Sequence, residues 1–330
     1  MHHRKLGASD LEVSVVALGT WAIGGFMWGG TDEKSAMEAI HRSIDLGVTT
    51  IDTAPAYGFG LSEEIVGKAI KGVRDKVQIL TKFGLSWDDP GSRDYWEIKD
   101  PDGRPVRIYH DARKGKVIRE CEDSLRCLGV DHIDLYQQHW PDDDTPIDET
   151  MQAVEKLLKD GKIRAAGVSN FDAQLMSQAR LRVKIASCQP PYSMLQRDIE
   201  EDVVPYCMDN GIGLIVYSPL QRGLLTGKVT PDRDFPETDH RSGLRMFSRE
   251  NRRRILDFLE RIRPIAQGHN ATLAQLAINW TIRRPGITSA LVGARNASQA
   301  EENARAADFE LTREEIVEID TELGRLVLET

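Results

Sequence analysis

Four polar side chains that could carry out acid–base chemistry stand at or just after short apolar runs of the sequence. Asp52 and Tyr57 lie in the segment Ile51-Asp-Thr-Ala-Pro-Ala-Tyr-Gly58, and Lys82 and His139 each follow a further run. An ammonium beside a tyrosine lowers the pKa of the phenol, and a carboxylate beside the lysine keeps that ammonium charged. These residue types predict a general acid, Tyr57, tuned by Lys82 and Asp52. His139 is expected to hydrogen-bond the oxygen of the substrate.

Each of the four also has an ordinary structural explanation when it is taken alone. Asp52 could cap a helix, and Tyr57 could be a packing aromatic. Lys82 could be a surface charge, and His139 could be a satisfied histidine beside Trp140. The proposed chemistry requires all four to share one pocket, so the elements that position them decide between the two interpretations.

Eight short apolar runs, typical of buried strands, alternate with stretches of helical period. The expected strands are 15–18, 50–52, 77–81, 133–137, 163–168, 185–188, 213–217 and 290–292. The expected helices are 32–46, 62–70, 114–128, 147–159, 172–179, 199–209, 252–267, 273–282, 298–306 and 312–323. Eight strand–helix units predict a closed (β/α)8 TIM barrel, although an open doubly wound sheet would show the same local alternation. In a barrel the strand ends converge at one mouth, which would bring the four side chains together.

Residues 1–330 are expected to form this single domain, with an N-terminal β-hairpin at 3–14 and extra C-terminal helices. Two longer stretches, 83–111 and 219–248, lack a regular pattern and follow strands, so they are candidate lids at the mouth, unless they are variable loops without a function. Aromatic residues are candidates to line that mouth, although some of them are expected only to pack: Trp21, Phe26, Trp28, Trp87, Tyr95 and Trp96.

Composition excludes several classes of partner. The chain has 330 residues and a formal net charge of -9, which would repel a phosphate backbone, so nucleic acid is not an expected partner. No segment reads as a signal peptide or a membrane span, so no membrane partner is expected and the cytoplasm is the expected location. The four cysteines include no CxxC pair, and no metal site is expected.

Several motifs, in order along nearly the whole chain, resemble those of the aldo-keto reductase family. They are the segment at 52–58, the strand that ends in Lys82, Asp134-Leu-Tyr-Gln-Gln-His-Trp-Pro141, and Gly161-Lys-Ile-Arg-Ala-Ala-Gly-Val-Ser-Asn170. Gln189-Pro-Pro-Tyr192 and Arg222-Gly-Leu-Leu-Thr-Gly-Lys228 resemble the bacterial stress-type NADPH-dependent members of that family.

The resemblance implies reduction of a small aldehyde or ketone to an alcohol, by hydride transfer from NADP(H), in a monomeric barrel. Asp52, Tyr57, Lys82 and His139 match the family's catalytic tetrad without a departure. The same match implies cofactor contacts at Gly19, Thr20, Trp21, Asp52, Ser169, Asn170, Gln189, Tyr217, Ser218, Leu220, Gly223, Lys228, Gly293, Arg295, Gln299, Glu302 and Asn303. Within this set Tyr217 would stack on the nicotinamide, while Ser169, Asn170 and Gln189 would bind its carboxamide. Asn170 could instead cap a helix.

The sequence lacks the G-x-G-x-x-G fingerprint of a Rossmann site, since Gly58-x-Gly60 and Gly211-x-Gly213 have no third glycine. The phosphates are therefore expected at the glycine turn and helix that follow the last strand. There Arg295 is expected to bind the phosphate that distinguishes NADP from NAD, unless it is a solvated loop charge.

Two other functions fit the same motifs. One is a non-catalytic or regulatory barrel that senses the redox state of nicotinamide through the same site. The other is a sugar dehydrogenase that works in the oxidative direction, because the same residues catalyse both directions.

Overall fold

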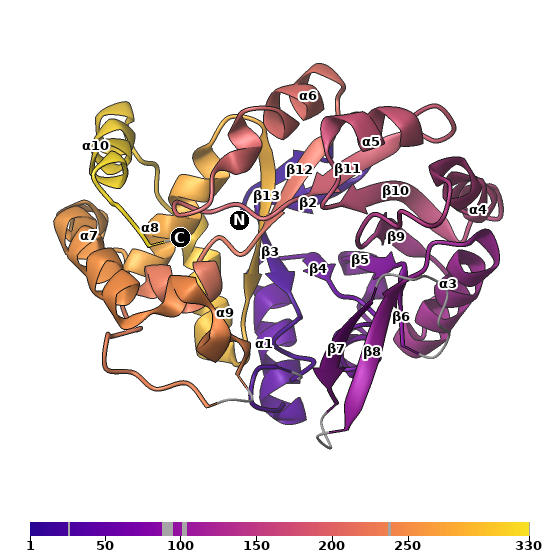
Figure 1. The fold of residues 1–330 in the computed structure, drawn as a ribbon, viewed down its shortest axis with the longest axis horizontal. Coiled ribbons are helices and arrows are strands. Elements are labelled where there is room, and N and C mark those ends of the chain that lie inside the picture. The colour runs from indigo at the N-terminus through magenta and orange to yellow at the C-terminus, as the bar shows by residue number, and fades with distance from the viewer. Residues whose placement is uncertain (26, 88–94, 101–103, 237–238, 330) are drawn as a thin grey trace.

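The computed structural model describes residues 1–25, 27–87, 95–100, 104–236 and 239–329. Within these ranges, eight parallel strands close into a barrel (Figure 1). They are β3 (Val16–Gly19), β4 (Thr50–Asp52), β5 (Gln78–Phe83), β9 (Ile133–Gln138), β10 (Ile163–Ser169), β11 (Ile185–Gln189), β12 (Gly213–Tyr217) and β13 (Ile287–Gly293). All eight expected strands are confirmed, and β13 pairs with β3, so the sheet is closed and not open.

Helices surround the barrel, as Figure 1 shows. They are α1 (Glu33–Asp45), α2 (Leu61–Ala69), α3 (Lys114–Leu128), α4 (Ile147–Lys159), α5 (Ala173–Ala179), α6 (Val203–Asp209), α7 (Arg249–Gly268), α8 (Leu273–Arg283), α9 (Ala297–Ala304) and α10 (Arg313–Gly324). The helix expected at 199–209 is divided into a 3-10 turn, Asp198–Glu200, and α6. Asp202 separates the two, because its backbone is not helical and its carboxylate caps the N–H of Val203.

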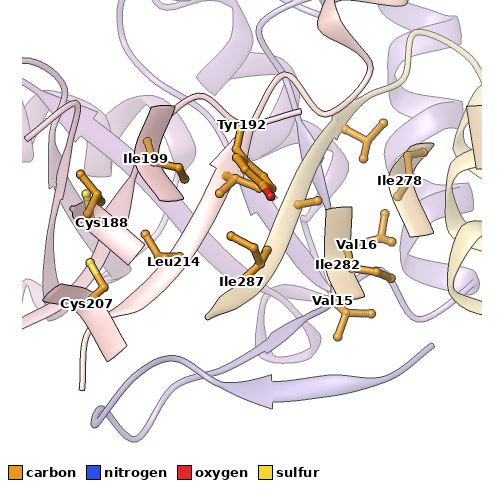
Figure 2. Close-up of a cluster of buried hydrophobic side chains, with 14 of the residues drawn as sticks. Val15, Val16, Cys188, Tyr192, Ile199, Cys207, Leu214, Ile278, Ile282 and Ile287 are labelled. Carbon is orange, nitrogen blue, oxygen red and sulfur yellow. The ribbon is translucent and has the colours of Figure 1, made fainter. Parts of the chain in front are cut away.

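The largest core lies between the strands and the helices outside them. Figure 2 shows Leu214 of β12 and Ile287 of β13 in this layer, together with Ile278 and Ile282 of α8. These side chains are at most 4% exposed. Burying each one stabilises the fold by about 1.5–3 kcal/mol relative to leaving it in water.

The expected N-terminal hairpin is confirmed as β1 (His3–Lys5) and β2 (Glu12–Ser14). Its apolar residues Leu6 and Val13 pack against inward-facing barrel residues such as Leu80 and Leu135. Gly7 has a φ of +55°, and a Cβ there would lie 2.4 Å from the carbonyl oxygen of Gly211. The hairpin therefore closes the end of the barrel at which the strands begin, and the site lies at the other end.

The expectation of an irregular 83–111 segment is wrong. Its described residues form an antiparallel sheet of β6 (Leu85–Ser86), β8 (Pro105–His110) and β7 (Tyr95–Lys99). The 219–248 segment has 3-10 turns at Gln221–Thr226, His240–Gly243 and Arg245–Phe247. Across the described chain, every helix is too short or too polar to cross a membrane.

Candidate functional site

The barrel brings the four predicted side chains together where its strands end. Lys82 is fully buried, and its Nζ contacts Oδ1 of Asp52. The same ammonium donates to the carbonyl oxygen of Thr53 at 3.0 Å and to the Tyr57 hydroxyl at 3.2 Å. The ring of His139 meets that of Tyr57 edge to face, with centroids 5.8 Å apart.

Burial and charge act in opposite directions on Lys82 and Tyr57. Burial acts to lower the pKa of Lys82, but Asp52 and Tyr57 outweigh it and the pKa lies above its ordinary value. Burial raises the pKa of Tyr57, and the opposing charge of Lys82 does not overcome it. The sequence-based expectation of a lowered tyrosine pKa is therefore wrong in direction. Tyr57 keeps its proton at neutral pH, which is the state that a proton donor needs.

His139 is uncharged at neutral pH. Burial, and after it the charges of Lys82 and His110, hold the pKa of the imidazole well below its ordinary value. A neutral imidazole has one N–H donor and one acceptor, so His139 can hydrogen-bond an oxygen atom without adding a charge to the pocket.

A cavity of about 780 Å³ opens beside Tyr57 and His139. Its wall contains every residue that the resemblance assigned to cofactor binding: Gly19, Thr20, Trp21, Asp52, Ser169, Asn170, Gln189, Tyr217, Ser218, Leu220, Gly223, Lys228, Gly293, Arg295, Gln299, Glu302 and Asn303. Lys82 is absent from this wall, and it reaches the cavity through Tyr57.

Directly after β10, Asn170 belongs to a hydrogen-bonded network. Its amide donates to the carbonyl oxygen of His139 at 3.0 Å and to the Ser169 hydroxyl at 3.1 Å, and it accepts from the Tyr217 hydroxyl at 2.9 Å. Asp172, and not Asn170, caps α5. The helix-cap explanation of Asn170 is therefore wrong.

The other part of the wall comes from the loop after β13 and from α9. Nη1 of Arg295 donates to the carbonyl oxygen of Trp28 at 2.7 Å, and its backbone N–H donates to Gln299 Oε1 at 2.9 Å. Lys228 and Glu302 form an ion pair of 3.2 Å, which links the 219–248 segment to α9. Arg295 is exposed but anchored, so its remaining N–H groups can still reach a ligand.

Arg222 is among the cations in the wall that sequence reasoning missed. Its Nε is buried without a hydrogen-bond partner, and no ion pair joins its side chain to another described residue. Burial lowers the pKa of its guanidinium. Its neighbour Arg241 is different, because that guanidinium contacts Asp239 at 2.9 Å. Arg222 is the first residue of the motif Arg222-Gly-Leu-Leu-Thr-Gly-Lys228, but only the three-dimensional structure shows that its guanidinium lacks an ion-pair partner.

The predicted mouth is only partly as expected. Trp21 and Trp28 line the cavity, with ring centroids 5.2 Å apart. Trp87, Tyr95 and Trp96 are absent from the wall, as are the other described residues of the 83–111 segment. Phe26 lies outside the described residues.

Comparisons with known proteins agree on one family. The family model of the aldo/keto reductase family matches residues 15–323. The chain is 40% identical to the aldo-keto reductase YhdN of Bacillus subtilis strain 168, over 99% of this chain and 95% of that protein. It is 37% identical to the NADH-specific methylglyoxal reductase of Escherichia coli strain K12, over 93% and 94% of the two chains. The solved structure of the glycerol dehydrogenase AKR11B4 from Gluconobacter oxydans is similar with a TM-score of 0.89 and 40% identity, over 99% and 96%.

Proposed function

Because the chain belongs to the aldo-keto reductase family, we propose that it reduces aldehydes or ketones to alcohols with NADPH, with Tyr57 as general acid. One observation carries this proposal. The ammonium of Lys82 is buried between the carboxylate of Asp52 and the hydroxyl of Tyr57, and that tyrosine lines the cavity.

The cavity suits a dinucleotide phosphate in size and charge. Arg222 is a half-buried cation without an ion-pair partner among the described residues, and removing such a group from water is costly unless a ligand supplies the counter-charge. Arg295 adds a further guanidinium at the wall. When bound, the cofactor supplies the hydride that the carbonyl carbon accepts.

The chain's own groups handle the proton. Tyr57 donates its hydroxyl proton to the carbonyl oxygen, and the Lys82 ammonium, 3.2 Å away, stabilises the phenolate that remains. Asp52 keeps Lys82 charged. The neutral imidazole of His139 hydrogen-bonds the same carbonyl oxygen and holds it toward Tyr57.

A preference for NADPH over NADH rests on Arg295 and Gln299, which stand next to each other at the wall. A guanidinium can bind the additional phosphate of NADPH through charge-assisted hydrogen bonds. The similarity to an NADH-specific reductase makes this preference a point to be measured.

Oxidation of a polyol is the second candidate function. The similarity to a glycerol dehydrogenase at 40% identity favours it, and the same proton-handling group serves both directions. In that direction Tyr57 would act as the base, helped by Lys82.

One set of assays separates these functions. The protein is mixed with a panel of aldehydes and ketones and either NADPH or NADH, and with glycerol and either oxidised cofactor. The absorbance of the reduced nicotinamide is followed. We expect the largest kcat/KM for a carbonyl with NADPH. Turnover of glycerol alone would favour the polyol dehydrogenase, and binding of NADPH without any turnover would contradict both.

A further inference from the structure

Gln137 places a second buried amide beside that of Gln189 inside the barrel. Gln137 of β9 and Gln189 of β11 both donate through Nε2 to the same atom, Oδ2 of Asp52, at 3.2 and 2.8 Å. Gln189 Nε2 also lies 3.2 Å from Gln137 Oε1. Gln137 is 0% exposed and Gln189 is 2% exposed, so water does not compete for these bonds.

The chemistry of the carboxylate fixes the orientation of both amides. An ionised carboxylate can only accept hydrogen bonds, so both amides must turn their NH2 groups toward Asp52. These two donors occupy Oδ2, while Oδ1 contacts Lys82. Asp52 is thus held from both sides, and the oxygen that contacts the lysine is fixed by the amides on the other oxygen.

The barrel makes room for Gln137 at one particular place. In the strand register, Gln137 stands beside Lys82 of β5 on one side and Gly167 of β10 on the other. A Cβ at position 167 would lie 2.9 Å from Cγ of Gln137 and 2.4 Å from the Ser187 hydroxyl. A leucine could fill the same volume without burying an amide, so packing alone does not account for a glutamine here.

We propose that Gln137 is a positioning residue for the reaction, which acts through Asp52 by holding its Oδ2 so that Oδ1 stays on Lys82. This inference rests on the proposed function, because it concerns the group that supplies the proton. Asp52, Gln137 and Gln189 then form one unit that links the proton donor to the cavity wall at Gln189.

A double-mutant cycle tests this role. Single-turnover reduction of an aldehyde is measured for Gln137→Leu in the wild-type and Asp52→Asn backgrounds. Losing a hydrogen bond to a charged group should lower the rate about ten- to a hundredfold in the first background. In the second, where the charge is gone, the same change should cost less than about twofold. Denaturant unfolding of the same four proteins should show a matching non-additivity, and it needs no cofactor.

Two further variants sharpen the test. Gln138→Leu removes a buried amide from the same strand, but that amide donates to the carbonyl oxygen of Trp140 at 3.1 Å, so its effect should be equal in both backgrounds. Gln137→Glu offers a donor to Asp52 only while its carboxyl is protonated, because two adjacent carboxylates cannot both be charged cheaply. Its activity should therefore recover as the pH falls, unlike that of Gln137→Leu.

The outcomes separate a failure of the proposed function from a failure of the proposed role of Gln137. A wild-type protein that binds NADPH but reduces no carbonyl overturns the proposed function, and the role of Gln137 with it. A wild-type protein that turns over, while Gln137→Leu costs the same factor in both backgrounds, overturns the role of Gln137 alone. Failure of Gln137→Glu to recover at low pH also contradicts that role.

Discussion

Glu63 of α2 is a buried carboxyl close to Lys82, and its titration gives a quantitative prediction of how the stability of the protein depends on pH. The residue is 2% exposed, and its carboxyl accepts a hydrogen bond of 2.6 Å from the hydroxyl of Thr81, the residue before Lys82. Burial raises the pKa of Glu63 to about 7, against opposing contributions from Thr81 and the Lys82 charge. Glu63→Gln keeps the shape and an acceptor for Thr81 but removes the titration.

The sign and size of the effect follow from linkage. The ordinary pKa of a glutamate is 4.5, so between 4.5 and about 7 the folded protein binds a proton that the unfolded chain has released. Stability is therefore highest at low pH and falls as the pH rises through about 7. One pKa unit corresponds to about 1.4 kcal/mol, so the whole effect is about 3 kcal/mol.

The assay is denaturant unfolding of the wild type and Glu63→Gln across this range. From about pH 5 to about pH 8, the stability of the variant relative to the wild type should rise by about 2 to 3 kcal/mol. Glu64→Gln is the matched control, because Glu64 is the exposed neighbour on the same helix, and its curve should follow the wild type. Parallel curves for Glu63→Gln and the wild type would refute the reasoning.

Three further predictions concern charges at the site. Lys82→Met should slow single-turnover reduction about 10²- to 10⁴-fold, since the proton donor loses its stabilising charge. It should also lower the free energy of unfolding by about 3–5 kcal/mol, because Asp52 stays buried without its cation, and normal activity would contradict the coupling. Arg295→Ala should weaken NADPH about ten- to a hundredfold in fluorescence titrations and leave NADH nearly unchanged. Arg222→Met should instead weaken both cofactors, and equal weakening of both by Arg295→Ala would remove the assignment of NADPH preference to Arg295.

The barrel was readable from the sequence because its strands are buried on both faces. Val16–Gly19 (Val-Ala-Leu-Gly) and Gly213–Tyr217 (Gly-Leu-Ile-Val-Tyr) therefore read as nearly continuous apolar runs. The sheet of β7 and β8 was missed for the opposite reason. Tyr95 and Trp96 are 43% and 38% exposed, so this sheet lacks the continuous apolar runs of the barrel strands.

At the site, the motifs identified residue types, and the barrel explained why distant motifs meet. The sequence could not give the direction of the Tyr57 pKa, because burial outweighs the nearby Lys82 and depends on the whole fold. The unpaired charge of Arg222 was hidden for the same reason, since a missing partner has no sequence pattern. Gln137 belongs to the motif at 134–141, but its proposed role depends on a hydrogen bond to Asp52, which lies 85 positions away in the sequence.

The most direct test of the central claim is stopped-flow reduction of an aldehyde by NADPH with Tyr57→Phe. The variant keeps the ring that packs on His139 and removes only the hydroxyl that Lys82 contacts. The rate should fall about 10²- to 10⁴-fold while NADPH affinity stays within about twofold of the wild type. An undiminished rate of reduction would contradict the assignment of Tyr57 as the proton donor.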